Sequence, residues 1–443
     1  MKKESIYTNS ITFKGILAIA IPTIFMSLIQ ASYSMIDGMF ISNILGDEAL
    51  SALTLISPYL NFFIAIGALF ASGGSAVVMK KIGKNKKHEA RTDFTTLSFI
   101  AASIGLLLSI LFIVFTKSFI AIFNVSESVR ELCREYLFSY SFFIIPQILF
   151  AVFQIFTIGA GRAKLAMISS LIGGIINIVL DFVMIKILTM GMAGAAISSG
   201  FGMLIPCIIL FSNFINKKTF LYFSSLRFDL KVVLKTFSNG ISEFASNLVS
   251  GIVIMLFNAK MLTIAGPSGV AASTITFYVF GLMGALYIGY MLGVSPLLSY
   301  FYGANETLKL RIIKNISIKF ISIVSIVTTV LAIASSNILV GAFTEQNSTA
   351  YNLAVSGNKL FSLALLIVGF NTFSSMLFTA LSNGRTSAVI AFSRSFVFLS
   401  IAIIVLPLIW GINGLWLSVP ISELLAGVIS IFYIKKYKNI YNY

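Results

Sequence analysis

Long apolar stretches, separated by short polar ones, run through nearly the whole chain of 443 residues. A helix that crosses the hydrocarbon core of a bilayer needs about 20 predominantly apolar residues, and the chain has room for about twelve such helices. Hydrophobic residues make up 58% of the chain and charged residues only 10%, whereas a soluble globular domain has about 25% charged residues. The sequence therefore predicts an integral membrane protein.

The spans are expected to be helices, because an open strand edge leaves backbone hydrogen-bonding groups unsatisfied in hydrocarbon. We predict an all-α membrane fold with twelve transmembrane helices. The stretch "MKKESIYTNSITFKG" leads directly into a full-length span, so no cleavable signal peptide is expected. The predicted helices cover residues 14–41, 51–79, 94–116, 132–158, 165–188, 193–215, 236–264, 271–301, 316–343, 352–379, 386–409 and 414–436.

Lysines and arginines gather in alternate loops. The opposite loops, such as 43–49, 265–269 and 411–414, are nearly free of them. By the positive-inside rule, this predicts a multi-pass protein of the cell membrane with both termini in the cytoplasm. It also accounts for the net charge of +16 without a nucleic-acid partner. The basic loops contain Lys2, Lys3 and Lys14, residues 80–91, Arg162 and Lys164, residues 217–235 and 309–319, Arg385, and residues 435–438.

Glycine-containing loop motifs recur at an offset of 220 residues, which indicates an internal duplication. It predicts two six-helix lobes, residues 1–215 and 236–443, joined by a cytoplasmic linker at 216–235. Because six is even, both lobes have the same orientation and are related by an axis along the membrane normal. The motifs are "ILGDEALSAL" with "IAGPSGVAAS", "IGKNKK" with "YGANET", "GMAG" with "GING", and, at an offset of 223, "GAGRA" with "SNGRT".

An arrangement of two six-helix lobes in the lipid bilayer is typical of a secondary transporter. The chain has no G-x-x-x-x-G-K-[ST] phosphate loop, so transport would be driven by an ion gradient. With two cysteines and one histidine, neither a disulfide framework nor a Cys/His metal site is indicated, and an enzyme is not expected. No cofactor is predicted beyond a coupling ion, and we expect the monomer to function.

Four carboxylic acids lie well inside predicted spans, where each charge costs about 2.5–3.5 kcal/mol on insertion scales. They are Asp37, Asp181, Glu243 and Glu423. Asp37 is about 33 Å along the first helix and Asp181 about 24 Å along the fifth, which puts both in the outer half of the membrane. Intramembrane acids of this kind indicate a functional site. The alternatives are an acid at a helix end for Asp37, and a structural hydrogen bond between Asp181 and Asn177.

Several polar side chains could converge with these two acids. Tyr33 and Asn177 each precede an acid by four residues and so share its helix face. Ser198, Ser199 and Tyr136 lie near the outer ends of their helices. Carboxylates, an amide and hydroxyls in a partly dry site could bind Na⁺, with Asp37, Asn177 and Asp181 as ligands. Alternatively, they could bind a proton.

The second half of the chain has no copy of this site, because the aligned positions are Phe257 and Ile401. Its own intramembrane acids are Glu243 and Glu423. We expect Glu423 either to pair with Arg394 or to contact a cationic drug. Glu243 is either part of the coupling path or an acid near the cytoplasmic end of its helix. Trp410 and Trp416 flank the last outer loop and are expected at the membrane interface.

Four stretches are characteristic of a known family: "PTIFMSLIQASYSMIDGMFISNILG", "GAGRAKLAMISSLIGGIINIVLDFV", "GMAGAAISS" and "NGRTSAVIAFSRSF". In them, and over essentially its whole length, the sequence resembles the MATE family of multidrug and toxic compound extrusion antiporters. The resemblance implies a cation site at Asp37, Asn177, Asp181 and Ser199, although the family more often has threonine at the last position. It also implies a role in cation coupling for Glu243.

We therefore expect a multidrug efflux antiporter, coupled to Na⁺ or H⁺, that exports small lipophilic and often cationic compounds by alternating access. Pro22 is expected to let the first helix bend. The alternative is a lipid-linked oligosaccharide flippase of the same superfamily. A flippase would need a basic cleft for pyrophosphate, whereas the intramembrane basic residues are at most Lys260, Lys359 and Arg394.

Overall fold

The structure is a computed structural model that describes residues 7, 11–123, 125–215, 217, 219–346 and 348–443. Over these residues the chain is almost entirely helical and contains no strand. Nine helices in this part of the chain are long and apolar enough to cross a membrane, and a tenth span results if the bent pair α6 and α7 is counted as one. The chain is thus an all-helical integral membrane protein, as predicted.

Within its described residues, the first lobe contains eight helices and three short π-helical segments. Its helices are α2 (Phe13–Phe40), α3 (Asp47–Ala68), α4 (Gly74–Gly83), α5 (Lys87–Ile120), α6 (Glu127–Ser141), α7 (Ile144–Gly159), α8 (Ala163–Asp181) and α9 (Gly191–Ile215). The π-helical segments are η1 (Ile41–Leu45), η2 (Leu69–Gly73) and η3 (Phe182–Ile187).

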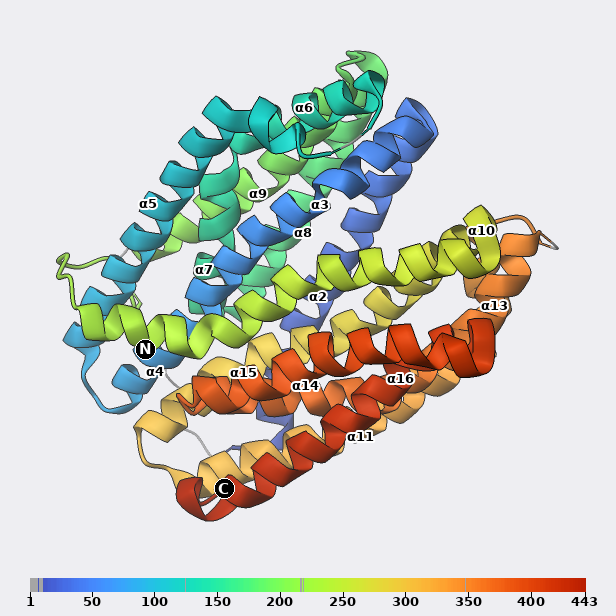
Figure 1. Cartoon of the computed structure of the whole chain (residues 1–443). Helices are drawn as coiled ribbons and strands as arrows, with labels where there is room; N and C mark the ends of the chain where they lie inside the picture. The colour runs from blue at the N-terminus through green and yellow to red at the C-terminus, as the bar shows by residue number, and fades with distance from the viewer. Residues whose placement is uncertain (1–6, 8–10, 124, 216, 218, 347) are drawn as a thin grey trace.

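The second lobe contains two very long helices with shorter ones between them (Figure 1). It consists of α10 (Leu230–Gly303), α11 (Thr307–Ala334), α12 (Ser336–Gly341), α13 (Thr349–Phe361), the 3₁₀ segment η4 (Ser362–Ala364), α14 (Leu365–Ala380), α15 (Gly384–Phe392), the π-helical segment η5 (Ser393–Phe398) and α16 (Leu399–Tyr441).

The predicted number of twelve spans is recovered once the breaks in the long helices are considered. The 74 residues of α10 would extend about 111 Å as one straight helix, far beyond a hydrocarbon core of about 30 Å. The helix is broken at Gly266, where φ is 65°, and Figure 1 shows it turning back on itself there. A second break, at Gly411 with φ 55°, divides α16. Positive φ values of this kind favour glycine because it has no Cβ atom.

Two sequence-based expectations are corrected by the fold. The stretch 216–235 is not entirely a linker, because α10 begins at Leu230, where the Asp229 carboxylate caps the helix. Trp416 is not at the membrane interface: its side chain is fully buried. The indole packs against the rings of Phe257 and Phe361, whereas Trp410 is half exposed, as expected.

The duplication is visible in the backbone. Positive φ angles recur at the predicted offset of 220 residues, and the turns after α4 and α10 repeat the same pattern of three hydrogen bonds. The pairs are Gly46 with Gly266 (89° and 65°), Asn85 with Asn305 (59° and 57°), and Gly191 with Gly411 (60° and 55°). The two halves therefore have the same local design.

One predicted alignment of the repeat is wrong. The turn at 160–162 matches 381–383 in its hydrogen bonds, with positive φ at Gly161 and Ser382. The offset there is 221 residues, whereas aligning the two "GR" dipeptides gives 223. Ser382 adopts the left-handed conformation although it is not a glycine. Matching glycine to glycine therefore gave the wrong alignment of this turn.

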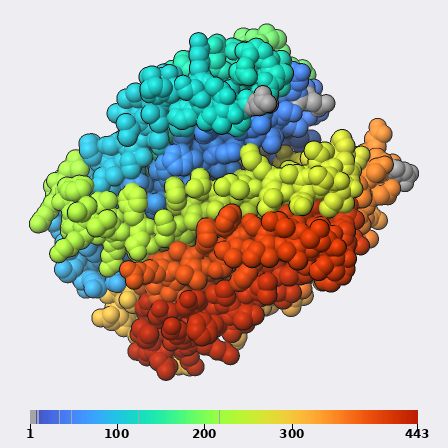
Figure 2. Space-filling view, in the orientation of Figure 1, coloured from blue at the N-terminus to red at the C-terminus, as the bar shows by residue number. Residues whose placement is uncertain are grey.

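The two lobes contact each other closely at one end. A Cβ atom on Gly83 would lie 2.0 Å from the carbonyl oxygen of Tyr300, and one on Gly303 would lie 2.0 Å from the carbonyl oxygen of Lys80. These contacts are reciprocal, as expected for lobes related by a pseudo-two-fold axis. At the other end, toward Gly266, Figure 2 shows a hollow between α3 and the first half of α10.

Candidate functional site

A polar cluster lies inside the first lobe, where α2, α6, α8 and α9 meet. The carboxyl group of Asp37 on α2 interacts with the side chains of Asp181 and Asn177 on α8 and of Ser199 on α9. Asp181 and Asn177 are buried, with exposed fractions of 0% and 1%. All four residues expected from the sequence to hold a cation are therefore brought together.

Many acceptor atoms of this cluster have no hydrogen-bond donor. Asp37 Oδ1, Asn177 Oδ1 and both carboxyl oxygens of Asp181 are buried and make no hydrogen bond within the part of the chain that the structure describes. Buried polar groups are almost always satisfied, since leaving one unpaired costs about 1–3 kcal/mol and more for a charged group. Four such oxygens close together form a site suited to a cation or a proton.

Tyrosines surround the two carboxylates. Tyr33 interacts electrostatically with Asp37, and the buried Tyr136 lies close to Asp37, Asp181 and Ser199. The sequence did not indicate two more: Tyr140, which donates to Gln147 at 3.0 Å, and Tyr278. Tyr278 comes from the second lobe, and its hydroxyl would lie 3.3 Å from a Cβ on Gly38, so only the docking of the lobes reveals it.

Small residues allow the helices of the cluster to approach closely. A Cβ atom on Gly202 of α9 would lie 3.0 Å from Asn177 Cβ, and one on Gly174 of α8 would lie 3.2 Å from the ring of Tyr33. In membranes, small residues at such contacts are the usual means of packing helices together. The glycines of α8 and α9 thus help to position Asn177 and Tyr33.

Each carboxylate of the cluster lies beside a π-helical segment. Asp37 is four residues before η1, and Asp181 directly precedes η3. In a π-helix the amide bonds to the carbonyl five residues earlier, and such segments occur frequently at functional sites. The aspartates therefore lie at the points where the regular hydrogen bonding of α2 and α8 changes.

The second lobe holds a different polar cluster, centred on Glu423. Its Oε1 atom lies 3.6 Å from Nη1 of Arg394, so the predicted ion pair is present. The amide of Asn371 donates to Oε2 of Glu423 at 2.7 Å, and Ser430 donates to Oδ1 of Asn371 at 2.9 Å. Arg394 also donates to Thr372. Unlike Asp181, this acid is satisfied by the protein itself.

Glu243 is about 20 Å along α10, because this helix begins at Leu230. Its charged neighbour is Arg394. Glu243 lines a cavity of about 190 Å³ between the lobes, together with Gln154 of α7 and Thr372 of α14.

The positions equivalent to the two aspartates are apolar in the second lobe. Phe257 is buried, with its ring 5.1 Å from that of Phe277, and Ile401 is 56% exposed. The acidic cluster is therefore confined to the first lobe. Pro22 lies inside α2, which continues through it as one helix from Phe13 to Phe40, so bending of this helix stays a prediction.

In the described part of the chain, apolar helices in two lobes, with unpaired carboxylate oxygens buried in one lobe, are the architecture of a polytopic membrane transporter. The MatE family model matches residues 22–183 and 241–406. The chain belongs to the MatE family, and the resemblance predicted from the sequence is confirmed.

Relatives and solved structures agree with this assignment. The multidrug export protein MepA of Staphylococcus haemolyticus is 24% identical, over 99% of this chain and 97% of its own length. MepA of Staphylococcus aureus strain N315 is 21% identical, over 97% and 95%. A crystal structure of a MATE protein in complex with MaL6 covers 100% of this chain and 99% of its own, with a TM-score of 0.94 and 20% identity. A transporter of the MOP superfamily from Pyrococcus furiosus gives 0.92 over the same shares, also at 20% identity.

Proposed function

We propose that this protein exports small lipophilic cations in exchange for Na⁺ or H⁺. The observation that carries the proposal is the set of buried, unpaired oxygens on Asp37, Asn177 and Asp181. A bound Na⁺ would use them as ligands, whereas a proton would be shared between the two carboxyl groups. Either cation would remove the repulsion between two neighbouring negative charges in a medium of low dielectric constant.

The position of the cluster favours coupling to the motion of the lobes. Asp37 lies near the end of α2 that leads to Gly46, and Tyr278 of the second lobe interacts with its carboxyl group. A cation that neutralises this carboxyl group changes the contact between the lobes at their hollow end. Because a ligand shifts a conformational equilibrium only by binding one state better, this contact is where the coupling would arise.

The second acidic cluster and the names of the relatives support the proposed substrate class. A cavity of about 360 Å³ in the second lobe is lined by Phe257, Phe277 and Phe361 together with Arg394 and Glu423. Aromatic walls with few polar groups suit small amphipathic ligands. A cation could compete with Arg394 for Glu423 or Glu243. Relatives that are named multidrug export proteins support export of such compounds.

The distribution of charge supports an orientation with the termini in the cytoplasm. In Figure 1 the C-terminus lies near the same end of the bundle as the α4 turn and the start of α10, and the basic loops gather there. Tyr7, the first residue that the structure describes, packs against Tyr300 at this end. The positive-inside rule assigns this end to the cytoplasm. The hollow would then open to the outside of the cell membrane. With the cation site complete within one lobe, a monomer would suffice for transport.

Efflux of a fluorescent cationic dye from cells tests the proposal. Wild type would be compared with Asp37→Asn, Asp181→Asn and the control Glu127→Gln, whose carboxyl group is 79% exposed. Each would be assayed in Na⁺ medium, in choline medium and with a protonophore, at matched membrane levels of protein. We expect at least a tenfold loss of efflux for both aspartate variants and none for the control.

The wild-type response identifies the ion. Loss of efflux in choline medium would identify Na⁺, and loss with the protonophore alone would identify H⁺. Efflux at the wild-type rate from both aspartate variants would reject the cation site.

A further inference from the structure

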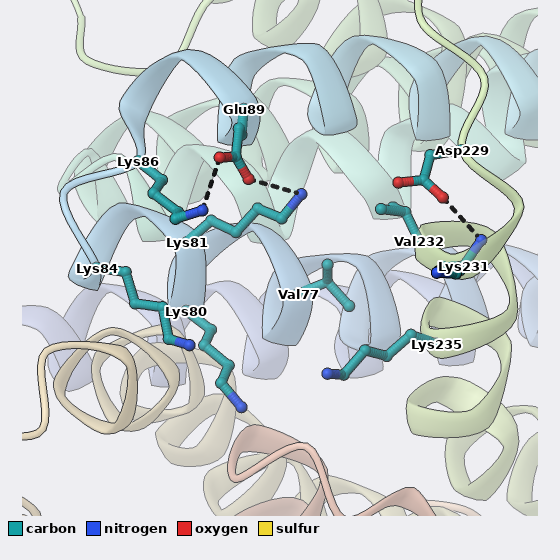
Figure 3. A pocket seen from close by; sticks show the side chains of 10 residues that line it. All are labelled: Val77, Lys80, Lys81, Lys84, Lys86, Glu89, Asp229, Lys231, Val232 and Lys235. Atoms are coloured by element: carbon teal, nitrogen blue, oxygen red, sulfur yellow. Dashed lines mark hydrogen bonds and ion pairs between the residues drawn. The ribbon is translucent and has the colours of Figure 1, made fainter.

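A third cavity, of about 280 Å³, lies on the opposite side of the lobe contact from the hollow, beside the turn after α4 (Figure 3). It is formed by the end of α4, the start of α5 and the start of α10, so both lobes contribute to it. Six lysines and two carboxylates line it. The lining residues are Val77, Lys80, Lys81, Lys84, Lys86, Glu89, Asp229, Lys231, Val232 and Lys235.

Only part of this positive charge is neutralised by the protein. Glu89 accepts from Lys86 at 2.8 Å and lies 3.5 Å from Lys81, and Lys81 also pairs with Asp93 at 2.6 Å. Asp229 is engaged at the N-terminus of α10, where it accepts from the backbone amide of Lys231. The carboxylates around the cavity are thus already used.

Lys80, Lys84 and Lys235 have no ion pair with any carboxylate that the structure describes. The amino group of Lys80 lies 4.1 Å from the centre of the Tyr302 ring, which holds it in place from the second lobe. Lys80 is subject to the positive charges of both Lys235 and Lys84. Figure 3 shows Lys80 and Lys235 extending toward each other below Val77, away from the Glu89 pairs.

We propose that this cavity binds a phosphate-bearing anion, with the headgroup of an anionic phospholipid as the favoured source. A phosphate offers several acceptor oxygens to ammonium donors that approach from different helices. The cavity lies at the C-terminal end of α4, on the side that the basic loops assign to the cytoplasm and its anionic leaflet. Basic pockets between transmembrane helices on that side are suited to phospholipid headgroups.

The anion would also join the lobes. Lys80 and Lys84 belong to the first lobe and Lys235 to the second, and they lie together in this conformation, in which Gly83 and Gly303 contact the opposite lobe. Without an anion, these like charges oppose the closed contact. A phosphate between them would therefore stabilise the conformation seen here. This inference rests on the fold and not on the proposed cation site.

Thermal unfolding of the purified protein in neutral detergent tests it. The triple variant Lys80→Gln/Lys84→Gln/Lys235→Gln would be compared with wild type and with a control of equal charge change, Lys164→Gln/Lys319→Gln/Lys438→Gln, whose lysines are exposed outside the cavity. Each would be titrated with cardiolipin, phosphatidylglycerol, phosphatidylcholine or inorganic phosphate, and bound lipid would be counted by native mass spectrometry.

We expect anionic lipid to raise the unfolding midpoint of wild type and control by several degrees, with at least tenfold weaker binding by the triple variant and no effect of phosphatidylcholine. An equal response to millimolar inorganic phosphate would support the site and identify a soluble source. The proposal is overturned if the triple variant responds to lipid as wild type does, or if the control loses the response to the same extent.

Discussion

At the scale of single residues, the buried acids of the two lobes differ in their partners. Glu423 forms an ion pair with Arg394 and accepts a hydrogen bond from Asn371. Asp181 has two buried oxygens without a hydrogen-bond donor in the described part of the chain. A satisfied acid stabilises the fold, whereas an unsatisfied one is available to an external cation. The two clusters therefore differ in whether the protein itself supplies hydrogen-bond donors and a positive charge to the carboxylate.

Replacing Arg394 by methionine tests the balance of the second-lobe cluster. The change removes the one positive charge that acts on both Glu423 and Glu243. We expect a destabilisation of about 3–5 kcal/mol, because the variant leaves the buried Glu423 without a counter-charge. The unfolding midpoint in detergent measures it.

Adding Glu423→Gln to Arg394→Met should recover part of the lost stability, since one uncompensated charge disappears. If the double variant is less stable than the single variant, the ion pair is not the source of the effect.

At the scale of elements, glycines determine how closely the helices approach. The backbones of α4 and α10 touch at Gly83 and Gly303, where a side chain would overlap the opposite carbonyl oxygen. This is not a requirement of conformation, because neither residue has a positive φ. The contact depends on space alone, which makes it a suitable point for mutation.

The variant Gly83→Ala should weaken the contact between the lobes. Since the added Cβ atom would lie 2.0 Å from the Tyr300 carbonyl oxygen, the lobes must separate locally, at a cost of about 1–3 kcal/mol. Spin labels at His88→Cys and Leu308→Cys, one in each lobe, should report longer distances. The native Cys133 and Cys207 are buried and would remain unlabelled.

Gly284→Ala is the control for this experiment, because a Cβ atom added to Gly284 would meet open space, with no neighbouring side chain or facing helix within 4 Å. It should leave the distance distribution unchanged. A Gly83→Ala distribution equal to that of the control would show that the contact does not hold the lobes together.

At the scale of the whole molecule, charge and shape are polarised along one axis. The contact between the lobes and the lysine cavity lie toward one end, and the hollow and the Asp37 cluster lie toward the other. A transporter of this design needs a definite orientation in the membrane, because the cation site must face the compartment that supplies the ion. Orientation is therefore the property on which the direction of transport depends.

Labelling with a membrane-impermeant maleimide on intact cells tests the orientation. Glu127→Cys, at the start of α6, should react from outside, and Lys309→Cys, near the start of α11, should react only after the membrane is permeabilised. The opposite pattern would place the termini outside and would contradict the proposed direction of export.

The sequence predicted much of this structure because the bilayer imposes simple rules. Span length and the requirement for internal backbone hydrogen bonds fixed the number and type of helices. Acids in apolar segments are costly, so Asp37 and Asp181 stood out. Trp416 was misplaced because a tryptophan near a loop can equally well fill a core, and here the contact with Gly357 provides the space.

What the sequence alone determined is the membrane class, the duplication, the family and the acids of the first lobe, since each depends on local composition, spacing or motif. What only the tertiary structure decided is how distant segments meet. Tyr278 beside Asp37, Arg394 beside Glu243, and the lysines of two lobes around one cavity depend on helix ends and on the docking of the lobes. Docking is set by close backbone packing at Gly83 and Gly303, and the sequence shows that these glycines recur but not which backbone each of them contacts.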